Sequence, residues 1–384
     1  MTALNKLVQA YDHKHKAALE WKENGGLVAA CLGADVPEEM LIAAGVLPVR
    51  IFGDGAATDT ADLYLEKGFD PGVRALFEQI VSGSYRYADR LFISNSSDAL
   101  IRVYYYLRAM REAEPDKPVP DLYFYDFLHT RYRMSALYNR ARTDVLLQEL
   151  EKWTGKRIAR EDLAAAIDVC NRNRELLNKV AELRTADRPR ISGANALRII
   201  GSSMVTPVRE HNEWLRRLLE EAPGYAPLDG VRLFFTGSAH DHPEFYELAE
   251  SCGGIVVGED HDKGDRHYAV MTDPNVDPID AIVDRYQFRS VSSSQGTVTE
   301  RTAELAKRVR ETRAEGVIAY IHESDDAPSW DFPEQRKALE AMGVSVLLLD
   351  RQPYRLRDDG GERDKIGRFI QSIRERKATG EGVL

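Results

Sequence analysis

The sequence predicts an α/β protein made of two parallel-sheet domains that a helical segment joins. Short apolar runs bounded by turn residues alternate with helical patterns in two separate parts of the 384-residue chain, as is typical of parallel sheets covered by helices. The stretch 132–222 between these parts shows helical spacing and no strand signal. The two α/β parts also repeat one order of motifs, so we interpret them as an internal duplication.

The first α/β domain is expected over residues 26–131, after an amphipathic N-terminal helix within residues 1–25. Its predicted strands are three short apolar runs, LVAACLG (27–33), RLFIS (90–94) and LYFYD (122–126). A helix is predicted in PEEMLIAAG, because proline favours the first turn of a helix and glycine favours the position after its end.

The helical segment is expected over residues 132–222 and the second α/β domain over 223–384. Apolar residues recur at helical spacing in SALYNRARTDVLLQELEKWTG and in REDLAAAIDVCNRNRELLNKVAELR. Four strands are predicted after residue 223, in VRLFFTG (231–237), GIVVG (254–258), GVIAYI (316–321) and VSVLLLD (344–350).

The duplication makes a prediction about the ligand site. In each half the first strand ends at a glycine, Gly33 or Gly237, and a Pro-Glu pair then opens a helix. A later strand ends in a similar polar tip, ISNSSDA in the first half and IHESDDA in the second. Ser97-Asp98 and Ser324-Asp325 are therefore expected at equivalent strand ends that face one cleft between the domains, where ligands are commonly bound.

Composition narrows the class of protein. The net charge of −10 argues against nonspecific binding of nucleic acid, which requires a basic surface. No apolar run approaches the roughly 18 residues that a membrane helix needs, and the N-terminal stretch lacks the apolar core of a signal peptide. Cys31, Cys170 and Cys252 are too widely spaced for a CxxC pair. We expect a cytoplasmic protein that binds neither nucleic acid nor membrane.

Several segments in a fixed order resemble the subunits of 2-hydroxyacyl-CoA dehydratases and benzoyl-CoA reductases. The resemblance is carried by VPEEMLIAAGVLPVR (36–50), DPGVRALFEQI (70–80) and FISNSSDALIRVYYYLR (92–108). It continues in LEKWTGKRIAREDLAAAI, in FFTGSAHDHPEFYELAESCGGIVVGEDHDKGDR and in GVIAYIHESDDAPSWDFPEQRKALEAMGV.

The resemblance implies two flavodoxin-like domains and a role in acyl-CoA chemistry. Family members work as oxygen-sensitive two-subunit modules, and a separate ATP-hydrolysing activator supplies a low-potential electron. A typical subunit holds a [4Fe–4S] cluster through three cysteines, at positions that correspond here to Asp70, Ser97 and Ser324. A further family cysteine corresponds to Asp262.

None of these positions is a cysteine, which is the main departure from the family. Iron–sulfur clusters are held by thiolates, and serine or aspartate oxygens are hard ligands that suit this iron poorly. Cys31 is near the first strand end but is expected to be a buried core residue, while Cys170 and Cys252 are not at family positions. The sequence therefore predicts no conventional cluster in this chain and places the [4Fe–4S] cluster in a partner subunit.

The polar strand end allows two interpretations. Ser96, Ser97 and Asp98 have the residue types of a helix N-cap, and the same helix terminus could instead receive an anionic group such as a thioester oxygen or a phosphate. A serine nucleophile needs an adjacent base, and no histidine is visibly paired with Ser97. The catalytic residues are therefore left unassigned.

Histidines and arginines supply the other candidates. His240, His242, His261 and His267 lie among acidic residues in two segments, which indicates either a metal site or polar loops. Arg74 and Arg266 keep basic positions of the family and could bind a carboxylate or a CoA phosphate, or form salt bridges. The residues expected to line the cleft are Gly33, Arg74, Ser96, Asp98, Gly237, His240, Arg266 and Asp325.

Three functional hypotheses follow. The first is a cluster-free subunit of an acyl-CoA dehydratase or reductase, which works with a cysteine-bearing homologous subunit and an activator ATPase. The second is a stand-alone binding or regulatory protein on the same scaffold. The third is a protein that holds a metal or cluster through ligands other than thiols, such as Asp70, His240 and Asp262.

Overall fold

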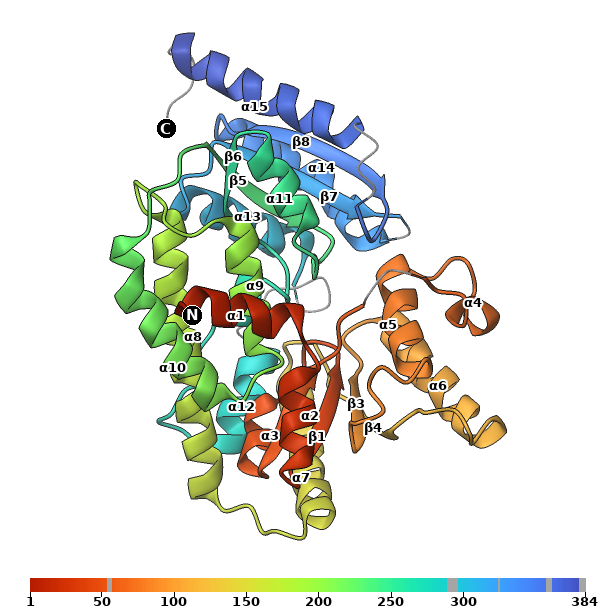
Figure 1. Ribbon diagram of the computed structural model, residues 1–384. Coiled ribbons are helices and arrows are strands. Elements are labelled where there is room, and N and C mark those ends of the chain that lie inside the picture. Colours follow the sequence, from red (N-terminus) through yellow and green to blue (C-terminus); the bar gives the residue numbers. More distant parts are fainter. Residues whose placement is uncertain (54–56, 289–295, 324, 357–360, 380–384) are drawn as a thin grey trace.

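The computed structural model describes residues 1–53, 57–288, 296–323, 325–356 and 361–379. Two four-stranded parallel sheets form the centres of an upper and a lower α/β domain, and a group of long helices lies along one side of both (Figure 1). The predicted α/β fold with two parallel sheets is confirmed. Among helices in the described part of the chain, none combines the length and the apolarity needed to cross a bilayer.

The first sheet has the strand order β2-β1-β3-β4. Its strands are β1 (Leu27–Leu32), β2 (Val46–Arg50), β3 (Arg90–Ser94) and β4 (Asp121–Tyr125), and the helices before and between them are α1 (Ala3–Asp12), α2 (Lys16–Glu23), α3 (Glu38–Ala43), α4 (Ala61–Tyr64), α5 (Pro71–Val81) and α6 (Asp98–Ala113). Strand β2 is not among the predicted strands, and it contains Pro48. It lies at the edge of the sheet, where a proline is tolerated.

The second sheet has the equivalent order β6-β5-β7-β8, so both sheets are wound in the same way. This supports the interpretation of an internal duplication. Its strands are β5 (Val231–Gly237), β6 (Gly254–Glu259), β7 (Gly316–His322) and β8 (Ser345–Gln352), and its helices are α11 (Glu244–Ser251), α13 (Val298–Glu311), α14 (Asp326–Ala341) and α15 (Gly361–Thr379). In this order the winding of the chain reverses between β1 and β3 and between β5 and β7, which is where such folds bind ligands.

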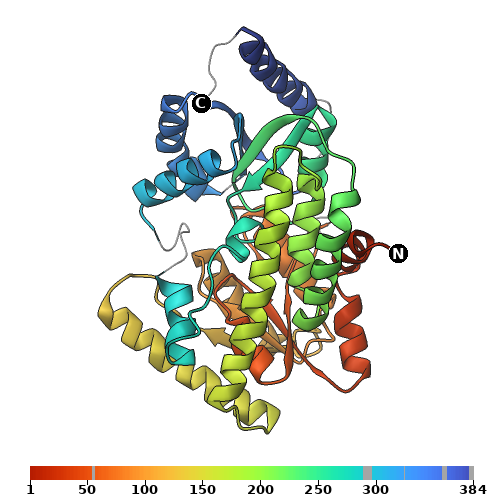
Figure 2. The ribbon, with the colours of Figure 1, turned by 90° about the vertical axis from the view of Figure 1, so that its left-hand side faces the viewer.

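Residues 133–221 are largely helical. They form α7 (Arg133–Thr154), α8 (Arg160–Thr185), α9 (Gly193–Ser203) and α10 (Val208–Glu221). Three further helical elements follow later in the chain: the short 3-10 helices η1 (Ala222–Gly224) and η2 (Asp265–His267) and the helix α12 (Pro278–Gln287). In Figure 2 the helices α8, α9 and α10 lie side by side next to the N-terminal helix α1.

Alternate residues of β1 point to opposite faces of the first sheet, as strand geometry requires. Val28 and Ala30 pack in a core that α1, α5, α6 and the helices α8–α10 complete, whereas Ala29 and Cys31 pack with α3, α7 and α12. Helix α12 therefore covers the first sheet although it follows β6 in sequence. On the second sheet, α9, α11 and α15 cover one face, and α13 and α14 cover the other.

Candidate functional site

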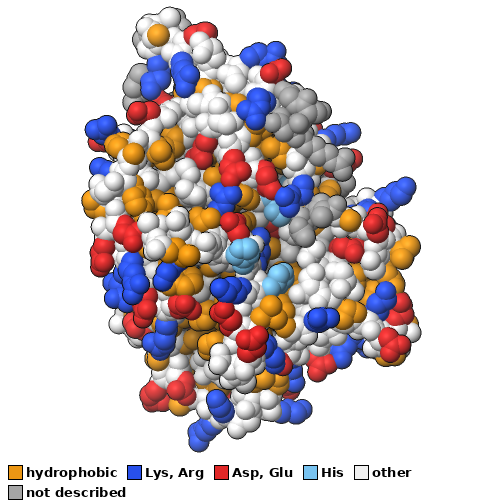
Figure 3. Space-filling view, viewed as in Figure 1, with side chains coloured by type: hydrophobic (Ala, Val, Ile, Leu, Met, Phe, Trp, Pro, Cys, Tyr) orange, Lys and Arg blue, Asp and Glu red, His pale blue; other side chains and the backbone are white. Residues whose placement is uncertain are grey.

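A cavity of about 570 Å³ lies where the carboxyl ends of the two sheets face each other. Side chains that follow β1, β2, β3, β5, β6, β7 and β8 all line it, and α5 and α6 complete the wall on the side of the first domain. In Figure 3, histidine, acidic and basic side chains gather near the middle of the face, between the upper and the lower domain. Of the predicted cleft residues, the structure brings five to this cavity: Gly33, Ser96, Asp98, Arg266 and Asp325.

Gly33 and Gly237 end the two equivalent strands in the same backbone conformation, with φ of +100° and +108°. A Cβ atom at Gly33 would lie 2.1 Å from the Ser94 hydroxyl oxygen, and one at Gly237 would lie 2.3 Å from the Tyr320 carbonyl oxygen. Both positions therefore require glycine. Gly33 lines the cavity, whereas Gly237 packs against β7 and is not part of the cavity wall.

Ser97 is the N-cap of α6, as one of the two interpretations predicted. Its hydroxyl oxygen accepts a hydrogen bond from the Leu100 amide at 3.3 Å. In the described part of the chain this is the one hydrogen bond of the Ser97 side chain, so no described histidine is hydrogen-bonded to it. The geometry therefore gives no support to a serine nucleophile.

Asp70 has the same capping role at α5. One of its carboxylate oxygens, Oδ1, accepts from the Val73 amide at 3.0 Å. The other, Oδ2, is buried and has no hydrogen-bond partner among the described residues. Burial, together with the nearby Asp325 carboxylate, raises the pKa of Asp70 to about 6. The local sequence explains the cap but leaves a second, unsatisfied oxygen that faces the other domain.

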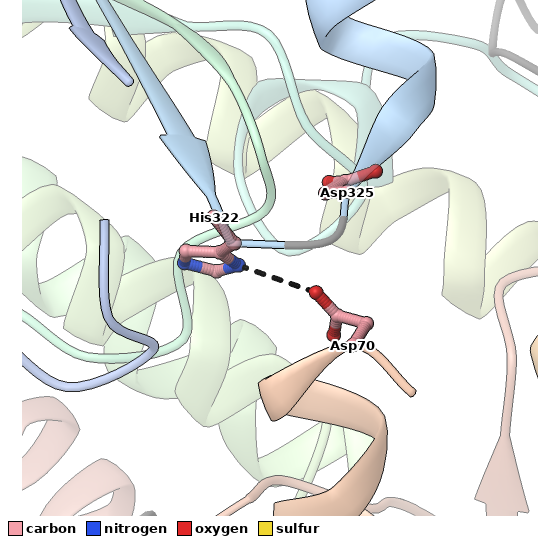
Figure 4. A group of neighbouring side chains, drawn as sticks. All are labelled: Asp70, His322 and Asp325. Atoms are coloured by element: carbon pink, nitrogen blue, oxygen red, sulfur yellow. Dashed lines mark ion pairs between the residues drawn. The ribbon is translucent and has the colours of Figure 1, made fainter. Parts of the chain in front are cut away.

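His322 and Asp325 approach Asp70 from the second domain (Figure 4). His322 is the last residue of β7 and is only 5% exposed, and Asp325 is the N-cap residue of α14. The Nδ1 atom of His322 lies 3.9 Å from Oδ2 of Asp70, which is too long for a hydrogen bond. One ligand atom from each of the three residues lies within 4.8 Å of the others. Burial lowers the pKa of His322 to about 4, so its imidazole is neutral at pH 7.

Most cations of the cavity are held by carboxylates. Arg50 pairs with Asp262 at 2.7 Å, and Lys263 pairs with Asp241 at 2.6 Å. Burial alone would raise the pKa of Asp262, but the guanidinium groups of Arg50 and Arg266 lower it to about 2.

Arg102 differs from these cations. It lies one turn into α6 and lines the cavity. Its guanidinium carbon is 5.8 Å from the centroid of the Phe69 ring, and no carboxylate in the described part of the chain pairs with it. Arg102 therefore brings a positive charge to the cavity that the described residues do not neutralise.

Two further predicted site residues, Arg74 and His240, do not line the cavity. Arg74 is outside the cavity wall and forms a salt bridge with Asp62, so the salt-bridge alternative holds for it. His240 is buried in an aromatic cluster, stacked on Phe245 and near Tyr320, and also does not line the cavity. The expected ligand trio of Asp70, His240 and Asp262 is therefore not brought together, because the His240 ring fills the core. Ser324 lies outside the described residues.

The donor set does not fit a conventional iron–sulfur cluster. The Ser97 hydroxyl is engaged as a cap and Asp70 offers a carboxylate oxygen, whereas a cluster is held by thiolates. Cys31 is near the cavity, but it is buried, its thiol contacts the Ala29 carbonyl, and burial raises its pKa to about 12. Such a thiol is a poor source of thiolate. Cys170 is buried in α8, and Cys252 lies at the end of α11.

Some residues of the cavity were missed by sequence reasoning. Arg50 ends β2, which was not predicted, and Arg102, Lys263 and Arg285 carried no pattern that separated them from ordinary surface cations. His322 did carry a signal. It directly follows the predicted strand GVIAYI (316–321) and comes two positions before the expected family ligand Ser324.

Together these features define a two-domain α/β protein with a cavity between the carboxyl ends of two similarly wound sheets. Within that class, the chain belongs to the family described as "2-hydroxyglutaryl-CoA dehydratase, D-component", whose profile matches residues 34–373. This confirms the resemblance that the sequence segments indicated.

Curated relatives are subunits of enzymes named for CoA thioesters. The chain is 23% identical to the (R)-phenyllactyl-CoA dehydratase beta subunit of Clostridium sporogenes, over 86% of this chain and 87% of that protein. It is 26% identical to a benzoyl-CoA reductase subunit of Thauera aromatica, over 79% and 80%. It is 20% identical to the beta subunit of (R)-2-hydroxyglutaryl-CoA dehydratase of Acidaminococcus fermentans, over 92% and 94%.

Proposed function

We propose that this chain is a subunit of an acyl-CoA dehydratase or reductase complex and binds an acyl-CoA thioester in the cavity between its domains. The observation that carries the proposal is the cavity itself, which residues from the carboxyl ends of both sheets line in a member of this family. Its volume of about 570 Å³ is in the range of small-molecule sites.

The cavity wall suits the parts of an acyl-CoA. Apolar side chains of Val36, Phe69, Leu76 and Met204 offer contacts to an acyl or pantetheine chain. The N-terminus of α6, where backbone N–H groups and the helix dipole favour negative charge, opens on the same cavity. Arg102 lies one turn further along α6 and is not neutralised by a described carboxylate. We assign this end of α6 and Arg102 to an anionic group, such as a phosphate of CoA.

The proposal also includes a partner. All three relatives described above are named as single subunits of larger enzymes, and the donor set of this chain is unsuited to a cluster. We therefore assign the [4Fe–4S] cluster to a cysteine-bearing homologous subunit, which an ATP-hydrolysing activator would supply with electrons. This chain would then contribute a cleft wall and bind substrate, and would carry no conventional cluster of its own.

Anaerobic co-expression with a cysteine-bearing homologue from the same genome tests the partnership. The expected result is a stable complex of the two chains whose activity on an acyl-CoA requires both. A chain that stays alone and binds acyl-CoA equally well without the homologue would support the stand-alone binding protein instead.

Analysis of acid-labile sulfide tests the cluster assignment. This chain, purified anaerobically by itself, is expected to contain no stoichiometric sulfide. Iron and sulfide in the proportions of a [4Fe–4S] cluster, one cluster per chain, would overturn the assignment.

A further inference from the structure

We infer that Asp70, His322 and Asp325 form a binding site for one divalent transition-metal ion, at the place where the two domains meet. The three side chains come from the start of α5, the end of β7 and the start of α14, and all line the cavity. The inference rests on their positions and does not depend on acyl-CoA binding.

Each side chain offers a donor atom that the protein leaves unused. Asp70 uses Oδ1 to cap α5, and its buried Oδ2 has no hydrogen-bond partner among the described residues. His322 is 5% exposed, and in the described part of the chain its ring nitrogens make no hydrogen bond. Its Nδ1 points toward Oδ2 of Asp70 (Figure 4). Buried polar groups are normally satisfied, so donors left in this state indicate a missing ligand.

Asp325 is oriented by a residue behind it. The Ser238 hydroxyl donates to Oδ2 of Asp325 at 2.6 Å and accepts from the backbone amide of His322 at 2.9 Å. Ser238 therefore links two of the three ligands and leaves Oδ1 of Asp325 without a described hydrogen bond. Such outer partners are typical of metal sites, where they fix the orientation of the ligands.

The distances fit one ion. Ligands of Zn²⁺ lie about 2.0–2.2 Å from the metal, so two ligands of a tetrahedral site are about 3.3–3.6 Å apart. The separation of 3.9 Å between Nδ1 of His322 and Oδ2 of Asp70 exceeds this by a few tenths of an ångström. The widest separation in the group is no more than 4.8 Å, so side-chain movements of up to about 1 Å bring all three ligands to one ion.

The donor types indicate which ion. Two carboxylates and one imidazole suit Zn²⁺, Mn²⁺ or Fe²⁺, whereas Mg²⁺ and Ca²⁺ prefer oxygen ligands alone. Three protein ligands leave coordination positions open, and the cavity provides space for a water or a ligand oxygen there. The site would place a Lewis-acidic centre in the cavity through oxygen and nitrogen ligands.

Calorimetric titration of the chelator-treated full chain with Zn²⁺, and separately with Mn²⁺, tests the inference. The expected result is one equivalent bound by the wild type and at least tenfold weaker binding by Asp70→Asn and His322→Gln. Asparagine also caps helices well, so Asp70→Asn is expected to fold. Asp98→Asn is the matched control, because Asp98 lines the same cavity outside the three ligands, and it should bind as the wild type does.

Several results would overturn the inference: no binding by the wild type, equal binding by the ligand variants, or equally tight binding of Mg²⁺. If the ligand variants do not fold, pulsed electron paramagnetic resonance of the Mn²⁺-loaded wild type decides, because a coordinated imidazole nitrogen is expected and its absence would contradict the site. A bound metal without sulfide would leave the cluster assignment intact, so the two proposals fail in distinguishable ways.

Discussion

Asp70 and Ser97 each serve a local purpose that is independent of chemistry, since both cap a helix that starts at the cavity. The two positions nevertheless differ in what remains after capping. The Ser97 hydroxyl accepts a hydrogen bond from the Leu100 amide, whereas the second carboxylate oxygen of Asp70 is buried without a hydrogen-bond partner among the described residues. At the residue scale, Asp70 is therefore the better functional candidate.

Replacing Ser97 by alanine should lower the free energy of unfolding by about 1 kcal/mol, because the substitution removes the cap of α6. Ser97→Asp should keep most of the stability, since aspartate is an equally good cap. Urea denaturation measures both variants. A loss well above about 3 kcal/mol for the alanine variant would show that Ser97 has a role beyond capping.

The buried imidazole of His211 should make the stability of the protein depend on pH. Burial lowers its pKa to about 3, from an ordinary value of about 6.5. Below pH 6.5 His211 is therefore protonated in the unfolded chain but stays neutral in the folded chain. The contribution of His211 to the free energy of unfolding falls as the pH falls toward 3. The loss attributable to this residue is about 2 kcal/mol between pH 7.5 and pH 5.

The variant His211→Gln isolates this effect, because glutamine does not titrate and can still bond to Asn173 and Ser202. Its unfolding free energy should depend less steeply on pH over the same range than that of the wild type. Parallel pH profiles for the two proteins would contradict the assignment.

At the scale of elements, a buried ion network ties the helical segment to the second sheet. Arg184 of α8 is 1% exposed and pairs with Glu259 at 2.6 Å and with Asp265 at 2.7 Å. Asp265 also pairs with Arg308 of α13 at 3.0 Å. The network holds the segment after β6, which contributes Asp262 and Lys263 to the cavity.

Arg184→Met should destabilise the protein by about 3–5 kcal/mol, because it leaves the carboxylate of Glu259 buried without a cation and leaves Asp265 with Arg308 alone. The exposed pair of Arg336 and Glu340 is the control, since Arg336→Gln should cost less than about 1 kcal/mol. Thermal unfolding of both variants measures the difference. Equal effects would mean that the Arg184 network contributes no more than a surface pair.

The sequence predicted elements better than side-chain directions. The alternation of strands and helices was sufficient to predict the two parallel sheets. The repeated pattern of glycine and polar strand ends was sufficient to place Ser96, Asp98 and Asp325 at one cavity. Strand β2 was missed because Pro48 is acceptable only at a sheet edge, and edge position depends on the whole fold. His240 was expected at the cleft because its sequence neighbours are polar, whereas its ring packs on Phe245.

At the scale of the whole molecule, the duplication explains why the cavity exists. Two sheets with the same strand order face each other, so their carboxyl ends supply residues from seven strands to one space. The helical segment packs on both sheets, because α8, α9 and α10 contribute to the core of the first sheet and α9 also contributes to the core of the second. The central claim is that this space binds an acyl-CoA thioester.

Equilibrium titration of the purified chain with an acyl-CoA, with the corresponding free carboxylic acid as a control ligand, tests that claim most directly. Arg102→Gln removes a cation of the cavity that forms no salt bridge with a described carboxylate, and Arg108→Gln on the same helix removes an exposed cation that is 3.7 Å from Glu112. We predict saturable binding of the thioester that weakens about tenfold or more in Arg102→Gln, as loss of a charged hydrogen bond implies, and is unchanged in Arg108→Gln. No binding of the thioester by the wild type, or equal binding by both variants, would contradict the account.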